Sequence, residues 1–218
     1  MNFEINPYVK EMIDSCRERT LPIVYGPHLL GLKGHWKEYF IKNNGMQPTK
    51  LILEIGVHNG RTMSEMAKNH SDFGFIGMDI TFKRVVTSAK AAKESSCSNI
   101  LSILGDARFI DEIFQDEELD AVIAFFPDPW IKKPGQTSKR LFKKDFLQML
   151  SNKLKPNGSF WFKTDAQSYF QEVEQSLQDT SLLASEKLEF IADTYRSTFE
   201  RKFLRKNLPI FEGVWSKG

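Results

Sequence analysis

One apolar run limits the possible folds of this chain more than any other feature of its sequence. The run extends from Leu119 to Phe126 and breaks off into Pro127-Asp128-Pro129-Trp130. A nearly continuous apolar run is typical of a strand that is buried on both faces of a parallel sheet. In such sheets ligands bind beyond the carboxyl ends of the strands, and the two prolines stop this strand at that point. Asp128 is therefore the first candidate for a catalytic residue.

Strand-like runs alternate with stretches of helical period from about residue 50 onward. The predicted strands are 51–55, 73–79, 100–104, 119–126 and 159–164, with a less regular one at 209–215. Strands that alternate with helices over this length form a parallel sheet covered on both faces, so we expect an α/β fold. Residues 1–48 are punctuated by prolines instead, and we expect an arm that packs on the domain of residues 49–218.

The composition argues against several classes of protein. The 218 residues carry 30 basic and 28 acidic side chains, so affinity for a polyanion must come from local clusters of charge. Two cysteines and four scattered histidines offer no spaced set of zinc ligands, and we expect no metal. The longest apolar run is far shorter than the roughly 18 residues of a membrane span, and the start lacks the pattern of a secretion signal. We therefore expect a soluble, cytoplasmic protein.

A glycine turn follows the first predicted strand. Residues 54–60 read Glu54-Ile55-Gly56-Val57-His58-Asn59-Gly60 where the chain passes from strand to helix. Glycine lets the backbone approach a ligand closely. The spacing of Gly56 and Gly60 fits the E-x-G-x-G-x-G turn of S-adenosylmethionine-dependent methyltransferases better than the dinucleotide pattern G-x-G-x-x-G. His58 stands in place of the middle glycine.

Acidic residues follow the strands on either side of this turn. Asp79 ends the second strand, where a carboxylate can accept both hydroxyls of a ribose, and Asp106 after the third can accept from an adenine amine. Glu54 would face the positively charged methionine end of the same cofactor. With Asp128, four acidic residues at four successive strand ends suit a cationic sulfonium, whereas they would repel a pyrophosphate. The alternative is that each is a helix cap or a solvated loop residue.

With these residues, the chain resembles the bacterial tRNA (guanine-N7)-methyltransferase family over roughly residues 50 to 215. The motifs that carry the resemblance are Phe126-Pro127-Asp128-Pro129-Trp130, Lys132-Lys133, Lys139-Arg140-Leu141, Lys155-Pro156-Asn157-Gly158, Thr164-Asp165 and Ser197-Thr198-Phe199-Glu200. The resemblance implies a Rossmann-like class I methyltransferase fold, with a mostly parallel seven-stranded sheet and helices on both faces. It also implies methyl transfer from S-adenosylmethionine to N7 of guanine 46 in the variable loop of tRNA.

The resemblance further implies a role for individual residues. The cofactor-binding set would be Glu54, Gly56, Gly60, Asp79, Asp106 and Asp128. Asp128 would also be catalytic, and the guanosine would meet Lys132, Asp165, Ser197 and Glu200. The expected partner is tRNA, bound by a monomer or a homodimer. The sequence departs from the family pattern at Asp79, where Glu is usual, and at Ser197, where Thr is usual.

The chemistry follows from the proposed target. Guanine N7 is a lone pair without a proton, so methyl transfer from a sulfonium needs in-line positioning and no general base. Positive charge moves from sulfur to the base, and a carboxylate in a dry pocket would stabilise that charge. N7 and O6 are both acceptors, so an ionised Asp128 cannot hydrogen-bond to that edge of the base. We therefore expect Asp128 to act electrostatically, with Lys132 nearer to O6 or a phosphate.

Two further groups of residues allow more than one interpretation. The loop residues Lys132 and Lys133 are predicted to contact phosphates, whereas Lys143 and Lys144 are expected to be solvated. Trp130 could stack on a flipped base or belong to the core, and Trp161 and Phe162 are expected in the core. Two other functions stay open: a methyltransferase of the same fold that acts on a small molecule or protein, and a catalytically silent tRNA-binding or partner-binding subunit.

Overall fold

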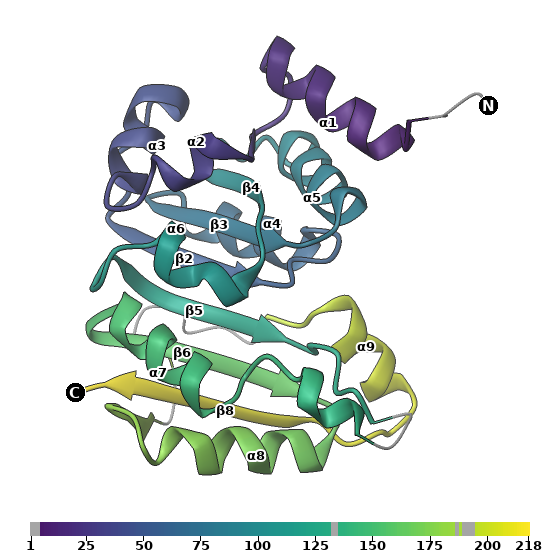
Figure 1. Ribbon diagram of the computed structural model, residues 1–218. Helices are drawn as coiled ribbons and strands as arrows, with labels where there is room; N and C mark the ends of the chain where they lie inside the picture. Colours follow the sequence, from purple (N-terminus) through teal and green to yellow (C-terminus); the bar gives the residue numbers. More distant parts are fainter. Residues whose placement is uncertain (1–4, 132–134, 186–187, 189–194) are drawn as a thin grey trace. The chain divides into compact units, whose positions relative to one another are not determined.

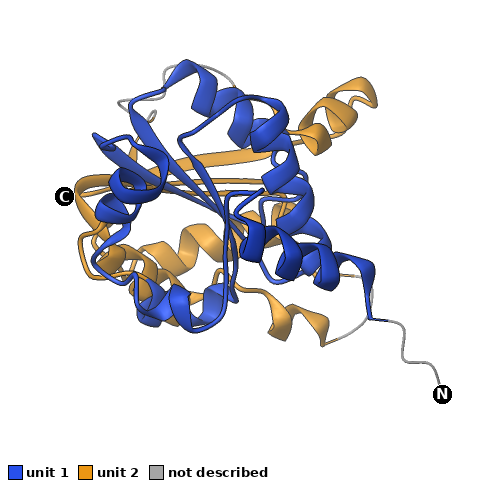
Figure 2. Cartoon of the chain, turned by 90° about the horizontal axis from the view of Figure 1, so that it is seen from above, with its two compact units in different colours: residues 1–113 blue, residues 114–218 orange. Residues whose placement is uncertain are grey.

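The computed structural model describes residues 5–131, 135–185, 188 and 195–218 (Figure 1). The chain forms two compact units, residues 1–113 and 114–218 (Figure 2). Strands and helices alternate in both, so the predicted α/β class is confirmed. The predicted division into an arm of residues 1–48 and a domain of residues 49–218 stays a prediction.

The first unit contains a parallel sheet in the order β1-β4-β3-β2. Its elements are α1 (Pro7–Glu18), β1 (Ile23–Val24), α2 (Pro27–Leu30), α3 (Trp36–Asn44), β2 (Lys50–Ile55), α4 (Arg61–Asn69), β3 (Phe73–Asp79), α5 (Phe82–Glu94), β4 (Ile100–Leu104), the 3-10 turn η1 (Ala107–Phe109) and α6 (Ile110–Ile113). Strands β3 and β4 have the predicted bounds. Their residues are buried almost throughout, as expected for strands covered on both faces.

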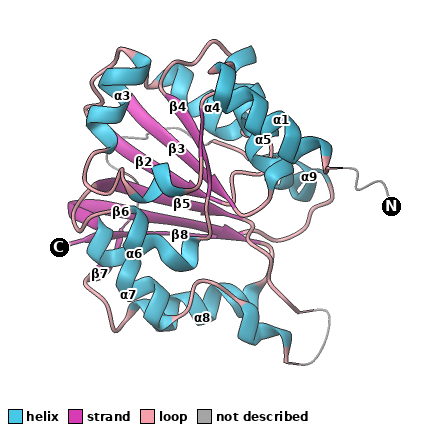
Figure 3. Ribbon diagram, turned by 45° about the horizontal axis from the view of Figure 1, so that its top comes forward, coloured by secondary structure: helices cyan, strands magenta, loops and turns pink. Residues whose placement is uncertain are grey.

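Helices cover both faces of this sheet, as two glycines of β3 show. A Cβ atom on Gly77 would lie 2.7 Å from Met63 of α4, whereas one on Gly74 would lie 3.0 Å from Phe40 of α3. Positions three apart in a strand point to opposite faces, so α3 and α4 lie on opposite sides of the sheet. Figure 3 shows α1 beside α5, and Met12 of α1 packs with Val85 and Val86 of α5.

The second unit has a mixed sheet in the order β5-β6-β8-β7. Its elements are β5 (Leu119–Phe125), the 3-10 turn η2 (Gln136–Lys139), α7 (Lys144–Lys153), β6 (Leu154–Thr164), α8 (Gln167–Leu177), β7 (Leu182–Ser185), α9 (Thr198–Arg205) and β8 (Phe211–Lys217). Strands β5 and β6 are parallel, and β8 runs antiparallel to both β6 and β7. Counting both units, the described residues form eight strands where seven were predicted. Neither β1 nor β7 lies in a strand range predicted from the sequence, and the two residues of β1 are too few for a periodic pattern.

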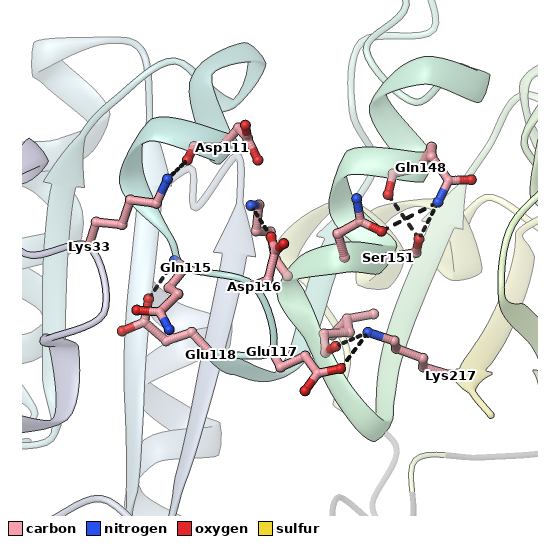
Figure 4. A network of polar contacts seen from close by, with 12 residues as sticks. Lys33, Asp111, Gln115, Asp116, Glu117, Glu118, Gln148, Ser151 and Lys217 are labelled. Carbon is pink, nitrogen blue, oxygen red and sulfur yellow. Dashed lines mark hydrogen bonds and ion pairs between the residues drawn. The ribbon is translucent and has the colours of Figure 1, made fainter.

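Aromatic rings fill the core of the second unit. Phe142 stacks on Phe160 with ring centroids 5.5 Å apart and meets Phe162 edge-on at 5.3 Å. Tyr169 of α8 meets Phe162 at 5.5 Å, so helices α7 and α8 cover the same face of β6. Just before β5, at the opposite end of the strand from its carboxyl end, Lys217 pairs with Glu117 and Lys153 pairs with Asp116 (Figure 4).

Candidate active site

Glu54 occupies an unusual position for a carboxylate. It lies inside β2 with only 6% of its surface exposed, and its Oε2 atom has no hydrogen-bond partner among the described residues. Burial raises the pKa of Glu54 to about 8, because the charged form loses its hydration. A buried carboxylate without a partner in the protein is suited to a cationic ligand, which would supply the missing interaction.

The turn after β2 has a backbone that favours glycine. Gly56, His58 and Gly60 all lie in the left-handed region, with φ values of 81°, 53° and 71°. His58 thus takes the conformation of the glycine that it replaces, and burial, followed by Arg84, lowers the pKa of its imidazole. A Cβ atom on Gly60 would lie 2.7 Å from Ser88 of α5, whereas one on Gly56 would meet nothing within 4 Å. Gly60 is therefore required for packing, and Gly56 borders open space.

The two aspartates that follow β3 and β4 are held by local hydrogen bonds. Asp79 Oδ1 accepts from the backbone N–H and the hydroxyl of Thr81, both at 2.9 Å. Asp106 accepts from the N–H of Arg108 at 3.0 Å and pairs with its guanidinium. The hydrogen bond from the Arg108 side chain lowers the pKa of Asp106. Each carboxylate still has lone pairs for a ligand, since an ionised carboxylate can accept about four hydrogen bonds.

These residues lie at one edge of the first unit. Ile55 pairs with Met78 and Asp79 pairs with Leu104, so β2, β3 and β4 end at nearly the same level. The edge carries the predicted residues Glu54, Gly56, Gly60, Asp79 and Asp106. Three carboxylates beside a glycine turn fit a cationic, hydroxyl-bearing ligand and disfavour a pyrophosphate.

In the second unit, strained backbone flanks the turn that carries Asp128. Phe126 and Trp130 have φ values of 54° and 49°, a conformation that costs a residue other than glycine roughly 1–2 kcal/mol. The Phe126 N–H donates to the Lys163 carbonyl at 2.7 Å. Asp128 itself is exposed. Strain of this kind is common at functional sites, and the catalytic role of Asp128 stays a prediction.

Arg140 anchors this turn through the Pro129 carbonyl, a role that was not predicted from the sequence. Its side chain is buried, and Nε donates to the Pro129 carbonyl at 2.8 Å. The guanidinium also pairs with Glu172 of α8 at 2.5 Å and lies 4.7 Å from the centre of the Tyr169 ring. From the sequence Arg140 belongs to a run of basic residues that suggests phosphate binding. The structure instead makes it a buried anchor of the Pro129 carbonyl.

Lys163 is a second buried cation that the sequence did not single out. Its Nζ lies 3.1 Å from Glu200 Oε2, 3.3 Å from Glu212 Oε1 and 3.3 Å from the Tyr195 carbonyl. It also sits 4.8 Å from the centre of the Trp161 ring. Glu200 in turn forms a capping box with Ser197 at the start of α9. Lys163 therefore fixes the N-terminus of α9 to the carboxyl end of β6 (Figure 1).

The residues predicted to contact the guanosine differ in their exposure. Asp165 is exposed directly after β6, next to β5 and its Asp128 turn in the sheet. Ser197 and Glu200 are buried, and the Glu200 carboxylate is engaged by Lys163. Lys132 and Lys133 lie outside the described residues, so their predicted contacts stay predictions. Trp161 and Phe162 belong to the core as predicted, and Trp130 is partly buried with Lys139 Nζ 5.1 Å from its ring centre.

Neither a cluster of metal ligands nor a membrane-spanning helix is found in the described part of the chain. Among these residues, no group of three or more His, Cys, Asp or Glu side chains could hold a metal ion. Within the same part of the chain, every helix is too short or too polar to cross a bilayer.

Comparisons with known proteins identify relatives of the chain. Residues 48–212 match the family model described as "Putative methyltransferase". The chain is 31% identical over 186 residues to a tRNA (guanine-N(7)-)-methyltransferase of Bdellovibrio bacteriovorus, covering 82% of this chain and 87% of that protein. It is 31% identical over 167 residues to the protein of the same name from Thermotoga maritima, covering 76% of this chain but only 49% of that one.

A solved structure shares the fold. A SAM dependent methyltransferase from Aquifex aeolicus is similar with a TM-score of 0.55 at 13% identity, covering 99% of this chain and 100% of that one. The methyltransferase model spans most of the sequence, and the Bdellovibrio alignment spans most of both proteins. The chain therefore belongs to the bacterial tRNA (guanine-N7)-methyltransferase family.

Proposed function

We propose that this protein transfers a methyl group from S-adenosylmethionine to N7 of a guanine in tRNA, at position 46 of the variable loop. The observation that carries the proposal is the Pro127-Asp128-Pro129 turn between two left-handed residues, in a chain whose relatives bear this activity in their names. The carboxylate edge of the first unit supports the choice of a cationic cofactor. S-adenosylmethionine would supply the methyl group on a positively charged sulfur.

The residues of the first unit account for binding of the cofactor. Glu54 would face the cationic methionine end, which would pair with its Oε2 atom. Asp79 would accept from the ribose hydroxyls and Asp106 from the adenine amine. Gly56 would leave room for the ligand, because a side chain there would enter open space. The buried Glu54 would lose a proton when a cation binds, because an adjacent positive charge favours the ionised carboxylate.

The residues of the second unit account for the base. Asp165 is exposed and can accept from the N1–H and the amino group of guanine, so the acceptor edge with N7 would stay open to methylation. Asp128 would stabilise the positive charge that reaches the base, as a carboxylate whose position is set by its strained turn. No proton leaves N7, so the reaction needs no general base. Ser197 and Glu200 would border the guanosine from the start of α9.

One experiment decides the reaction. The purified protein is incubated with unmodified tRNA and S-adenosylmethionine, and the nucleosides are mapped by mass spectrometry. The expected product is 7-methylguanosine at position 46. Another methylated nucleoside, or methylation of a small molecule or protein only, would overturn the proposal. Binding of tRNA without any methylation would favour the silent subunit instead.

A further inference from the structure

A cavity of about 950 Å³ opens within residues 13–43 of the first unit. Its walls come from the second half of α1, strand β1, and helices α2 and α3, which Figure 1 shows in purple and dark blue. None of the residues assigned to the cofactor or the guanosine lines it. The volume lies in the usual range for ligand pockets, roughly 300–1,000 Å³.

The charged residues of the lining are mostly cationic. Arg17, Arg19 and Lys42 contribute three positive charges, against the single carboxylate of Glu38. Arg17 lies 3.9 Å from Asp14. Arg19 and Lys42 form no ion pair with any carboxylate that the structure describes. Two exposed cations on the rim of one cavity favour an anionic ligand.

Two tyrosines give the cavity an aromatic component. Tyr25 and Tyr39 are partly buried in its wall, and Trp36 meets Tyr39 edge-on with ring centroids 6.4 Å apart. Burial raises the pKa of the Tyr39 phenol, so this side chain stays neutral and adds no negative charge. Aromatic faces interleaved with cationic side chains are the pattern that binds single-stranded nucleic acid, where bases stack and phosphates pair.

The cysteine in the lining does not indicate a reactive site. The Cys16 thiol lies 3.6 Å from the Ile23 carbonyl, to which it donates, and burial raises its pKa. It is therefore a neutral thiol and a poor nucleophile or metal ligand. The floor beside it is formed by the buried β1 residues Ile23 and Val24. An apolar surface suits the face of a base, while phosphates would pair with the cations.

We propose that this cavity binds a single-stranded segment of the tRNA, with phosphates on Arg19 and Lys42 and a base or ribose against Tyr25 and Tyr39. The inference rests on the proposed function, because it takes tRNA as the partner. It gives residues 1–48 a role in holding the substrate that is separate from the chemistry of methyl transfer.

The test removes two charges from the cavity. Arg19→Gln with Lys42→Gln is compared with the wild type for binding of unmodified tRNA, measured by fluorescence anisotropy at several salt concentrations. The matched control is Lys68→Gln with Lys93→Gln, which removes two exposed lysines of the same unit that do not line the cavity. Glutamine removes each positive charge and keeps a polar side chain, and circular dichroism checks that each variant folds.

The cavity variant is expected to bind tRNA about 10-fold more weakly, with kcat at saturating tRNA within twofold of the wild type. The slope of log affinity against log salt concentration should become shallower by about 0.7 to 0.9 for each phosphate that the variant no longer binds. The control should follow the wild type. Equal affinity and equal slope in the cavity variant and the control would overturn the inference, even if 7-methylguanosine forms. If the cavity variant alone loses affinity but the wild type makes no 7-methylguanosine, the inference stands and the proposed function fails.

Discussion

Replacing Glu54 by Gln should change how the stability of the protein depends on pH. The folded-state pKa of Glu54 is about 8, against a usual value of 4.5. Between these values the folded protein holds a proton that the unfolded chain releases. Stability therefore falls as the pH rises from about 4.5 to about 8, because the unfolded state binds fewer protons there. Glutamine does not titrate, so the variant lacks this contribution.

The size of the effect follows from the shift. One pKa unit corresponds to about 1.4 kcal/mol, so the wild type should lose about 2–3 kcal/mol relative to Glu54→Gln between pH 5.5 and 7.5. Urea unfolding of both proteins at these two pH values measures the difference. The matched control is Glu94→Gln, which removes an exposed carboxylate from the same unit and should follow the wild-type profile.

Addition of S-adenosylmethionine extends the test. A bound cation favours the ionised carboxylate, so the saturated wild type should lose less stability over the same pH interval. The reasoning would be refuted if the free energies of unfolding of the wild type and Glu54→Gln differed by the same amount at both pH values. That result would mean that Glu54 is ionised at neutral pH in the free protein.

The remaining predictions concern the turn, the buried lysine and the two glycines. Asp128→Asn should keep the fold, since the side chain is exposed. It should slow single-turnover methylation of tRNA by about 100-fold, which corresponds to about 2.7 kcal/mol of activation free energy. Wild-type turnover would refute the electrostatic role. Lys163→Met should lower the free energy of unfolding by about 3 kcal/mol, because it leaves the buried Glu200 unpaired. Adding Glu200→Gln to this variant should restore part of the loss. Additive effects of the two substitutions in urea unfolding would contradict this coupling. Gly60→Ala should cost about 2 kcal/mol through its clash with Ser88, measured by urea unfolding. Gly56→Ala should weaken binding of S-adenosylmethionine in calorimetry, beyond the folding cost of its left-handed backbone, which urea unfolding measures. Unchanged affinity would remove Gly56 from the cofactor site.

Much of the fold could be predicted because its signals are local. Strands β3 and β4 have the predicted bounds, since each is a short apolar run between turn residues. Phe142, Phe146, Leu150 and Leu154 recur at helical spacing, but helix α7 begins at Lys144, after the first of these residues, and Leu154 opens β6. Periodicity therefore finds an element more reliably than it finds its ends.

The sequence alone indicated the class of enzyme. Acidic residues after successive strands, a glycine turn and a Pro-Asp-Pro-Trp turn indicated a methyltransferase, because parallel strands bring their carboxyl ends to one edge. Neither the unpartnered Oε2 atom of Glu54 nor the anchoring roles of Arg140 and Lys163 could be read in this way. A local pattern does not say which long-range neighbours surround a charged side chain. Only the tertiary structure decided that Glu54 Oε2 lacks a partner among the described residues, and that Arg140 and Lys163 are buried and paired.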